Sequence, residues 1–206
     1  MAGFMPLMLD LKDKKAVVVG GGHIAAKRIQ SLIPYKPHIT VISPEITGEL
    51  ERLVRTGQIT WKKKRFSPED IKKAFIVIHA TDNPELSVEI RKSIPKHVLF
   101  NDAVTSSAGN VHFPAFIRRG MLTVAVSTGG ASPFLAKKVK RQLEKIFDED
   151  YARYVDFLAE CRSLIKQSDR RKEEQHFWLQ EILQEEYMHP EKQKQFLKWL
   201  KSTSEK

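Results

Sequence analysis

Glycines near the N-terminus have a spacing that could bind phosphate groups. The apolar run Ala16–Val19 predicts a short buried strand, and a helical pattern begins at His23. Between and just beyond them, Gly20, Gly22 and Ala25 match the spacing glycine-x-glycine-x-x-glycine or alanine of dinucleotide-binding turns. In such turns the first glycine permits the tight turn, the second lets backbone approach a pyrophosphate, and the third small residue lets helix and strand pack closely. The pattern predicts a nucleotide site at the helix start, and a purely structural glycine turn is the alternative.

A second candidate segment follows the next predicted strand, HITVI. It consists of Ser43, Pro44 and Glu45. Proteins that bind NAD usually place an acidic residue at this strand end, where it bonds to the ribose. Ser43 could still donate to a ribose hydroxyl, and no arginine follows immediately to hold a 2′-phosphate. The position therefore leaves NAD versus NADP open.

Two further polar segments follow strands at the same predicted edge. Thr81, Asp82 and Asn83 come after the apolar strand FIVIHA, and they either contact the cofactor or cap the next helix. Asn101 and Asp102 come after the strand VLF. Asp102 is the best-placed carboxylate of the chain, and a turn residue is the alternative.

A second glycine loop precedes a lysine-rich helix. Ser127 is its candidate catalytic residue, and its candidate substrate-binding residues are Thr128, Gly129, Gly130 and Ser132. Ser132 is a favoured N-cap, and the proline after it suits the first helical position. Backbone amides of such a loop can point at an anion, so we expect a second anion-binding helix start. A loop that only caps the helix is the alternative.

Histidine and cysteine residues give no sign of a metal site. The seven histidines lack a recognisable ligand spacing, and no serine–histidine–acid arrangement can be assigned from spacing. His79 is expected to be a core histidine within its strand, and His23 to lie against the cofactor. The single cysteine, Cys161, excludes an internal disulfide, fits a reducing compartment and is expected to be a buried thiol.

The composition is that of a globular protein with a basic excess. The chain has 206 residues, of which 41% are hydrophobic and 29% charged, with a formal net charge of +10. That charge favours a polyanionic partner, either nucleic acid, an anionic surface or a small molecule with many carboxylates or phosphates. Much of it lies in the runs 62–65, 137–141 and 170–172, for which a solvated face is the alternative. Aromatic residues are not interleaved with these runs, which disfavours binding of single-stranded nucleic acid.

No apolar run approaches the about 20 residues that span a bilayer, and the N-terminus lacks a signal pattern. We therefore expect a cytoplasmic protein without a membrane partner.

The order of elements predicts an α/β fold. Strands and helices alternate over the first hundred residues, which indicates a Rossmann-type parallel sheet with right-handed crossovers. The second helix is expected to open at Pro44 and to end at Gly57. After residue 110 the pattern changes to a β-hairpin over 111–127 and a helix over 132–147, and the chain is helical from residue 150 onward.

Several of these motifs together resemble the precorrin-2 dehydrogenase family of siroheme-pathway enzymes, which includes the N-terminal part of bifunctional siroheme synthase. The resemblance covers residues 5 to 147 and rests on LDLKDKKAVVVGGGHIAAKRI, VISPEI, IHATDNPELS, FNDAV and VHFPAFIRRGMLTVAVSTGGASPFLAKKVKRQLE. It implies a homodimer with an NAD-binding Rossmann domain (1–113), a dimerisation segment (114–147) and a C-terminal helical domain (148–206).

The resemblance also implies an activity, the oxidation of precorrin-2 to sirohydrochlorin by hydride transfer to NAD+. By position, cofactor contacts fall on His23, Ile24 and the Ser43–Glu45 segment. Ser127 and Thr128 match the serine pair of the family. Where the family carries asparagine-valine-valine-aspartate, this chain has an aspartate directly after Asn101, so Asp102 becomes the expected base.

Two alternatives stay open beside this dehydrogenase. Some members of the family also insert ferrous iron into sirohydrochlorin. A third possibility is a dinucleotide-sensing module that binds nucleic acid through its basic helices, although we expect no nucleic-acid partner.

Overall fold

The structure, a computed structural model, describes residues 3–105 and 108–204. The chain divides into two compact units, and the boundary in the sequence lies between Phe113 and Pro114. Each unit is described by itself.

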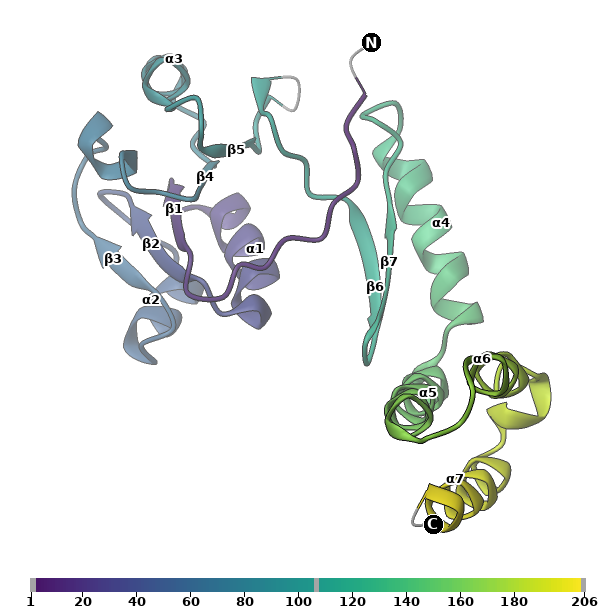
Figure 1. Ribbon diagram of the computed structural model, residues 1–206. Coiled ribbons are helices and arrows are strands. Elements are labelled where there is room, and N and C mark those ends of the chain that lie inside the picture. The colour runs from purple at the N-terminus through teal and green to yellow at the C-terminus, as the bar shows by residue number, and fades with distance from the viewer. Residues whose placement is uncertain (1–2, 106–107, 205–206) are drawn as a thin grey trace. The chain divides into compact units, whose positions relative to one another are not determined.

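The first unit is an open parallel sheet with helices on both faces, which confirms the predicted fold class. Its strand order is β3-β2-β1-β4-β5, and every neighbouring pair is parallel (Figure 1). The order of strands reverses between β1 and β4, so the expected ligand crevice lies at their carboxyl ends. The elements are β1 (Lys15–Val19), α1 (His23–Leu32), η1 (Ile33–Tyr35), β2 (His38–Ile42), α2 (Gly48–Arg55), β3 (Thr60–Lys62), η2 (Pro68–Ile71), β4 (Ile76–His79), α3 (Pro84–Ser93) and β5 (Leu99–Asp102).

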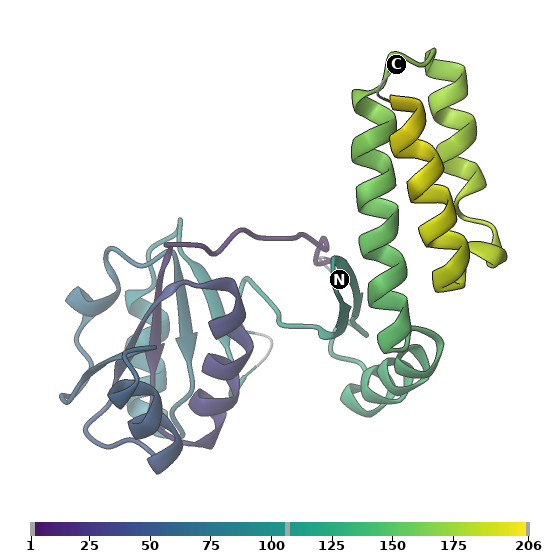
Figure 2. The ribbon, with the colours of Figure 1, turned by 90° about the horizontal axis from the view of Figure 1, so that it is seen from below.

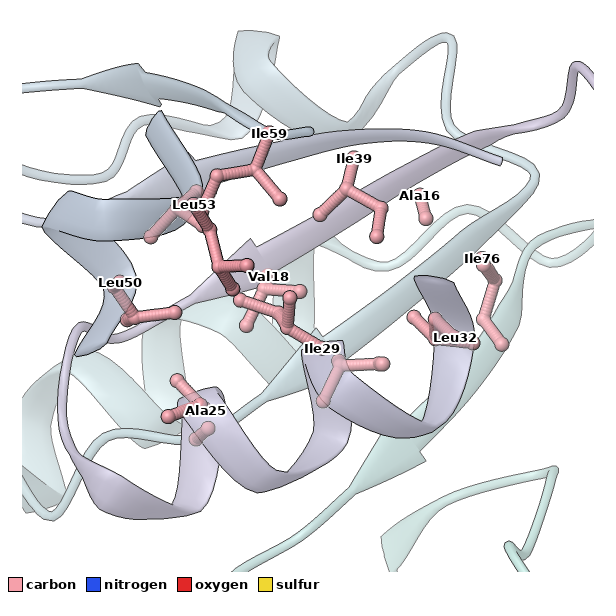
Figure 3. Packing of buried hydrophobic residues seen from close by; sticks show 14 of the residues in the cluster. Ala16, Val18, Ala25, Ile29, Leu32, Ile39, Leu50, Leu53, Ile59 and Ile76 are labelled. Atoms are coloured by element: carbon pink, nitrogen blue, oxygen red, sulfur yellow. The ribbon is translucent and has the colours of Figure 1, made fainter. Parts of the chain in front are cut away.

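Helices α1 and α2 cover one face of this sheet. From α1, Ala25, Ile29 and Leu32 pack in one cluster with sheet residues such as Val18 and Ile76 (Figure 3). Ala25 is 0% exposed, which fits the close helix–strand packing expected of this position. The packing fixes the start of α1 just beyond the end of β1.

Helix α3 and the short helix η2 cover the opposite face. Ile90 of α3 and Ile71 of η2 belong to a second cluster with Val17, Val77 and Phe100. Strand β4 is therefore buried on both sides, as its continuous apolar run predicted.

The predicted start of the second helix at Pro44 is wrong. Helix α2 begins at Gly48, and Thr47 before it is extended with φ −70° and ψ 156°. The Thr47 amide donates to the carbonyl oxygen of Gly21 at 3.0 Å, so this segment runs along the glycine turn instead of coiling. The helix ends at Arg55, two residues before Gly57, which has φ +70°.

The second unit joins a hairpin and a helix to a helical bundle. Strands β6 and β7 pair antiparallel, and α4 packs against them. Helices α5, α6 and α7 lie side by side around an aromatic core that includes Phe157, Trp178 and Phe196 (Figure 2). The elements are β6 (Ala115–Arg119), β7 (Leu122–Val126), α4 (Pro133–Ile146), α5 (Glu149–Gln167), α6 (Lys172–Glu181), η4 (Glu185–Met188) and α7 (Pro190–Ser204).

In the described part of the chain, none of the helices combines the length and apolar character that a bilayer span requires.

Candidate functional site

The three consecutive glycines after β1 differ in what surrounds them. Gly20 has φ +122°, and a Cβ there would collide with the carbonyl oxygen of Ala80 at the end of β4. A Cβ on Gly21 would collide with the carbonyl oxygen of Glu45. At Gly22 a Cβ would meet nothing within 4 Å. The first two glycines therefore let neighbouring loops come close, whereas the third leaves open space above the backbone.

That open space lies at the uncapped start of α1. Gly22 occupies the N-cap position but has no side chain that could accept a hydrogen bond from the helix amides. The first turn of the helix also contains no acidic residue. The first intrahelical bond runs from the Ala26 amide to the Gly22 carbonyl at 3.0 Å. The amides of His23, Ile24 and Ala25 thus lack intrahelical partners, and both His23 and Ile24 are exposed. This arrangement can hold an anion such as a diphosphate.

The segment after β2 lies beside the turn. The Trp61 indole Nε1–H donates to the carbonyl oxygen of Ser43 at 2.8 Å, which holds this residue against β3. The Ser43 hydroxyl faces Gly21 and is half-buried, whereas Pro44 and Glu45 are exposed. The predicted ribose-binding position is therefore adjacent to the predicted phosphate-binding turn, as a dinucleotide requires.

The segment after β4 completes this edge. The Ala80 amide donates to the Val19 carbonyl at 2.8 Å, which joins the ends of β4 and β1. Asn83 accepts from the Leu86 amide at 2.9 Å and so caps α3, the alternative given above for this segment. Thr81 is half-buried and Asp82 is exposed beside them.

Asp102 lies at the end of β5, but its carboxylate does not face solvent. Its side chain is 0% exposed. Oδ1 accepts from the amides of Val104 at 3.0 Å and Thr105 at 2.7 Å, and Oδ2 accepts from Arg91 Nε at 2.8 Å. His79 Nδ1 lies 3.1 Å from Oδ1, within ion-pair distance but without the alignment of a hydrogen bond.

These contacts keep the carboxylate ionised. Burial by itself raises the pKa of Asp102, but hydrogen bonds from the Thr105 amide and Arg91, the electrostatic effect of His79 and the Val104 amide together lower it. A buried carboxylate with a lowered pKa is a weak proton acceptor. The geometry therefore does not fit the base expected at Asp102, and it fits a group that holds the 103–105 loop and α3.

His79 connects this carboxylate to α3. The ring is fully buried, as expected of a core histidine, and its Nε2 lies 3.0 Å from Ser87 Oγ. Ser87 also donates to the Asn83 carbonyl at 2.8 Å. The order Ser87, His79, Asp102 has the distances of a hydrolytic triad, yet Ser87 is only 6% exposed, so no substrate reaches its hydroxyl.

The second glycine loop belongs to the other unit. Ser132 Oγ accepts from the Leu135 amide at 3.1 Å, which confirms the predicted N-cap of α4. Thr128 bonds through its hydroxyl to the Ser132 backbone, and Ser127 is exposed and accepts from the Gly129 amide at 3.2 Å. Gly129 and Gly130 have φ +61° and +90°. A Cβ at either would meet nothing within 4 Å.

The structure thus gathers three of the predicted segments at one edge of the first unit: the glycine turn, Ser43–Glu45 and Thr81–Asp82. Sequence reasoning missed Gly21, which the motif treats as variable, and the pairing of His79 with Asp102. Both partners end neighbouring strands, in register with each other, so the strand order would have shown the pairing. Within residues 3–105 and 108–204, no group of three or more His, Cys, Asp or Glu side chains could hold a metal ion.

Models of known protein families match most of the chain. A family model described as putative NAD(P)-binding matches residues 7–115, one described as sirohaem biosynthesis protein central matches 119–146, and the SirC C-terminal domain matches 151–196.

Curated relatives and a solved structure agree. A precorrin-2 dehydrogenase of Priestia megaterium is 38% identical over 93% of this chain and 95% of the relative. Another, from Bacillus subtilis (strain 168), is 36% identical over 77% of this chain and 98% of the relative. The siroheme synthase of Xylella fastidiosa (strain M12) is 34% identical, but the match spans only 34% of its length.

The solved structure of SirC, a precorrin-2 dehydrogenase, superposes with a TM-score of 0.87 at 36% identity, covering 97% of this chain and all of that one. Nearly full-length matches in both sequence and structure confirm the resemblance read from the motifs. The chain belongs to the precorrin-2 dehydrogenase family.

Proposed function

We propose that this chain oxidises precorrin-2 to sirohydrochlorin with NAD+ as the hydride acceptor. The observation that carries the proposal is the uncapped start of α1 beside the open space at Gly22, in a chain whose nearly full-length relatives are named precorrin-2 dehydrogenases. These relatives support dehydrogenation and add no support for iron insertion or nucleic-acid binding.

The residues at this edge fit a nicotinamide dinucleotide, which supplies the ring that accepts the hydride. The amides of His23 and Ile24 would hold its diphosphate, and Gly20 and Gly22 give the backbone room to approach. Ser43 would bond the adenosine ribose.

We assign NAD+ rather than NADP+ because the segment after β2 presents the exposed carboxylate of Glu45. A carboxylate repels a 2′-phosphate. Parallel titrations with NADH and NADPH measure the preference directly, and tighter NADPH binding would reverse the assignment.

Residues at the end of β4 and β5 would shape the nicotinamide half of the site. Thr81 and Asp82 follow the strand whose end contacts Gly20, so we expect them to contact the cofactor. Asp102 acts as a positioning residue, because it holds the amides of the 103–105 loop and Arg91.

The second glycine loop would bind the substrate. Ser127, the second residue we predicted to take part in catalysis, has an exposed side chain that can reach a bound molecule. Thr128, Gly129, Gly130 and the α4 start at Ser132 would bind substrate carboxylates. We further propose that residues 114–147 form the dimerisation segment of a cytoplasmic homodimer, between an NAD-binding domain (1–113) and a helical domain (148–206).

An anaerobic assay tests the activity. Purified protein, precorrin-2 and NAD+ should produce NADH and sirohydrochlorin in equal amounts, and the absence of NADH formation would refute the proposal. A parallel reaction with ferrous iron reports whether siroheme forms faster than without protein.

Two variants of Asp102 test its role in the same assay. Asp102→Asn keeps an oxygen that can accept from the loop amides, so we expect it to retain more turnover than Asp102→Ala and to keep the pH profile of kcat. Equal, complete loss of turnover in both variants, with NADH affinity retained in both, would instead make Asp102 the base.

A further inference from the structure

Helix α4 carries a basic groove on its side chains, separate from the glycine loop that precedes the helix. The groove has a volume of about 420 Å³ and lies along one face of the helix. Its lining residues, spaced at helical intervals of three and four, are Phe134, Lys137, Lys138, Arg141, Gln142 and Lys145. The opposite face, which includes the buried Ala136, packs on the hairpin, so the direction of the groove within this unit is fixed.

The cations of the groove are not neutralised. Across the part of the chain that the structure describes, no carboxylate lies within ion-pair distance of the four cationic side chains named above. The helix has a single carboxylate, Glu144, and it pairs at 3.5 Å with Lys140, which lies outside the groove. Like charges one turn apart, such as Arg141 and Lys145, repel each other. A bound polyanion would relieve that repulsion.

The form of the groove limits what the polyanion can be. From Phe134 to Lys145 the helix rises about 16 Å, so the four cations lie within one compact patch. Phe134 is 86% exposed at the end of the groove nearest the Ser132 cap, where its ring is free to stack on an apolar surface. Four separated cations and one exposed aromatic ring match a compact macrocycle that carries several carboxylates on its rim.

We infer that this face of α4 is a docking site for the carboxylates of a tetrapyrrole. The inference rests on the proposed function and adds to it a second contact region, on side chains of α4 instead of the amides of the glycine loop. Because the lining side chains are exposed in the single chain, the contribution of the groove is electrostatic and weakens as salt is added.

The test uses the full chain and uroporphyrin, an air-stable porphyrin with eight carboxylates, with binding followed by porphyrin fluorescence. One variant replaces all four groove cations by glutamine. A matched variant replaces four exposed lysines of α7, namely Lys192, Lys194, Lys198 and Lys201, and so changes the net charge equally. Protoporphyrin, with two carboxylates, tests the dependence on ligand charge.

Since an exposed ion pair changes affinity about 1.4- to 5-fold, we expect the groove variant to bind uroporphyrin at least about fourfold more weakly and the α7 variant to match the wild type. Wild-type affinity should fall with salt and should be lower for protoporphyrin. In turnover, the groove variant should raise KM for precorrin-2 and leave kcat unchanged.

Several results would overturn the inference. They are unchanged uroporphyrin affinity in the groove variant, an equal loss in the α7 variant, and no binding by the wild type. Binding of anionic phospholipid vesicles in place of uroporphyrin would also reject it, as would altered sedimentation of the groove variant at unchanged porphyrin affinity. If the wild type still oxidises precorrin-2 with NAD+ in these cases, the proposed function is supported and only the docking site is refuted.

Discussion

Replacing Gly22 by alanine separates cofactor binding from folding. Gly22 has φ −85° and ψ −170°, a conformation that alanine adopts without strain. The added Cβ meets no atom within 4 Å, so the protein itself has room for it. The space that it fills is the space above the α1 amides, where the diphosphate is expected.

The expected loss of NADH binding is larger than the expected change in the free energy of unfolding. Alanine is a poorer N-cap than glycine, which lowers the free energy of unfolding by up to about 1 kcal/mol. Alanine also restricts the unfolded chain, which raises the free energy of unfolding by about 0.4–1 kcal/mol. The free energy of unfolding should therefore stay within about 1 kcal/mol of the wild-type value. Hydrogen bonds to a charged group contribute about 1.5–3 kcal/mol each. Displacing the diphosphate from one amide should therefore weaken NADH binding by about 10- to 100-fold.

The measurement is a fluorescence titration with NADH beside a thermal unfolding curve. Gly48→Ala is the matched control, because Gly48 is the first residue of α2, is exposed and also has nothing within 4 Å of an added Cβ. It should bind NADH like the wild type. Wild-type affinity in Gly22→Ala would refute the assignment of the diphosphate to this turn.

Three other expectations follow from the contacts described. Gly21→Ala should lower both the unfolding temperature and NADH affinity, because its Cβ collides with the Glu45 carbonyl, and an unshifted unfolding curve would contradict that packing. The lowered pKa of Asp102 means that its stabilisation is present above its unfolded pKa of about 3.9 and is lost as pH falls through the folded value. Asp102→Asn should therefore be less stable at neutral pH and show a flatter acid-unfolding profile, and an unchanged profile would show that this carboxylate is not linked to folding. Burial raises the pKa of Cys161 to about 12, so iodoacetamide should label it only after denaturation, and rapid labelling of folded protein would show an accessible thiolate.

The glycine turn could be predicted because everything that defines it is local. A strand, a turn and a helix succeed one another within eleven residues, and the small residue at position 25 packs as the motif requires. The start of α2 could not be predicted from Pro44, because the segment before it bonds to Gly21, far back in the chain. Pro44 favours a helix start, but the tertiary hydrogen bond to Gly21 overrides that local preference.

The polar network around Asp102 could not be predicted either, because it also depends on contacts between residues far apart in the sequence. His79, Ser87 and Asp102 come from β4, α3 and β5, and no spacing along the chain relates them. Their contacts follow from the adjacency of β4 and β5 and from the packing of α3 on that face. The sequence identified Asp102 as a carboxylate at the right edge, but only the fold shows that its oxygens are already taken.

A crystal structure of the protein with NAD+ tests the central claim most directly. The account predicts a diphosphate within hydrogen-bond distance of the His23 and Ile24 amides, above Gly22. A dinucleotide bound elsewhere, with this helix start in contact with solvent alone, would contradict it.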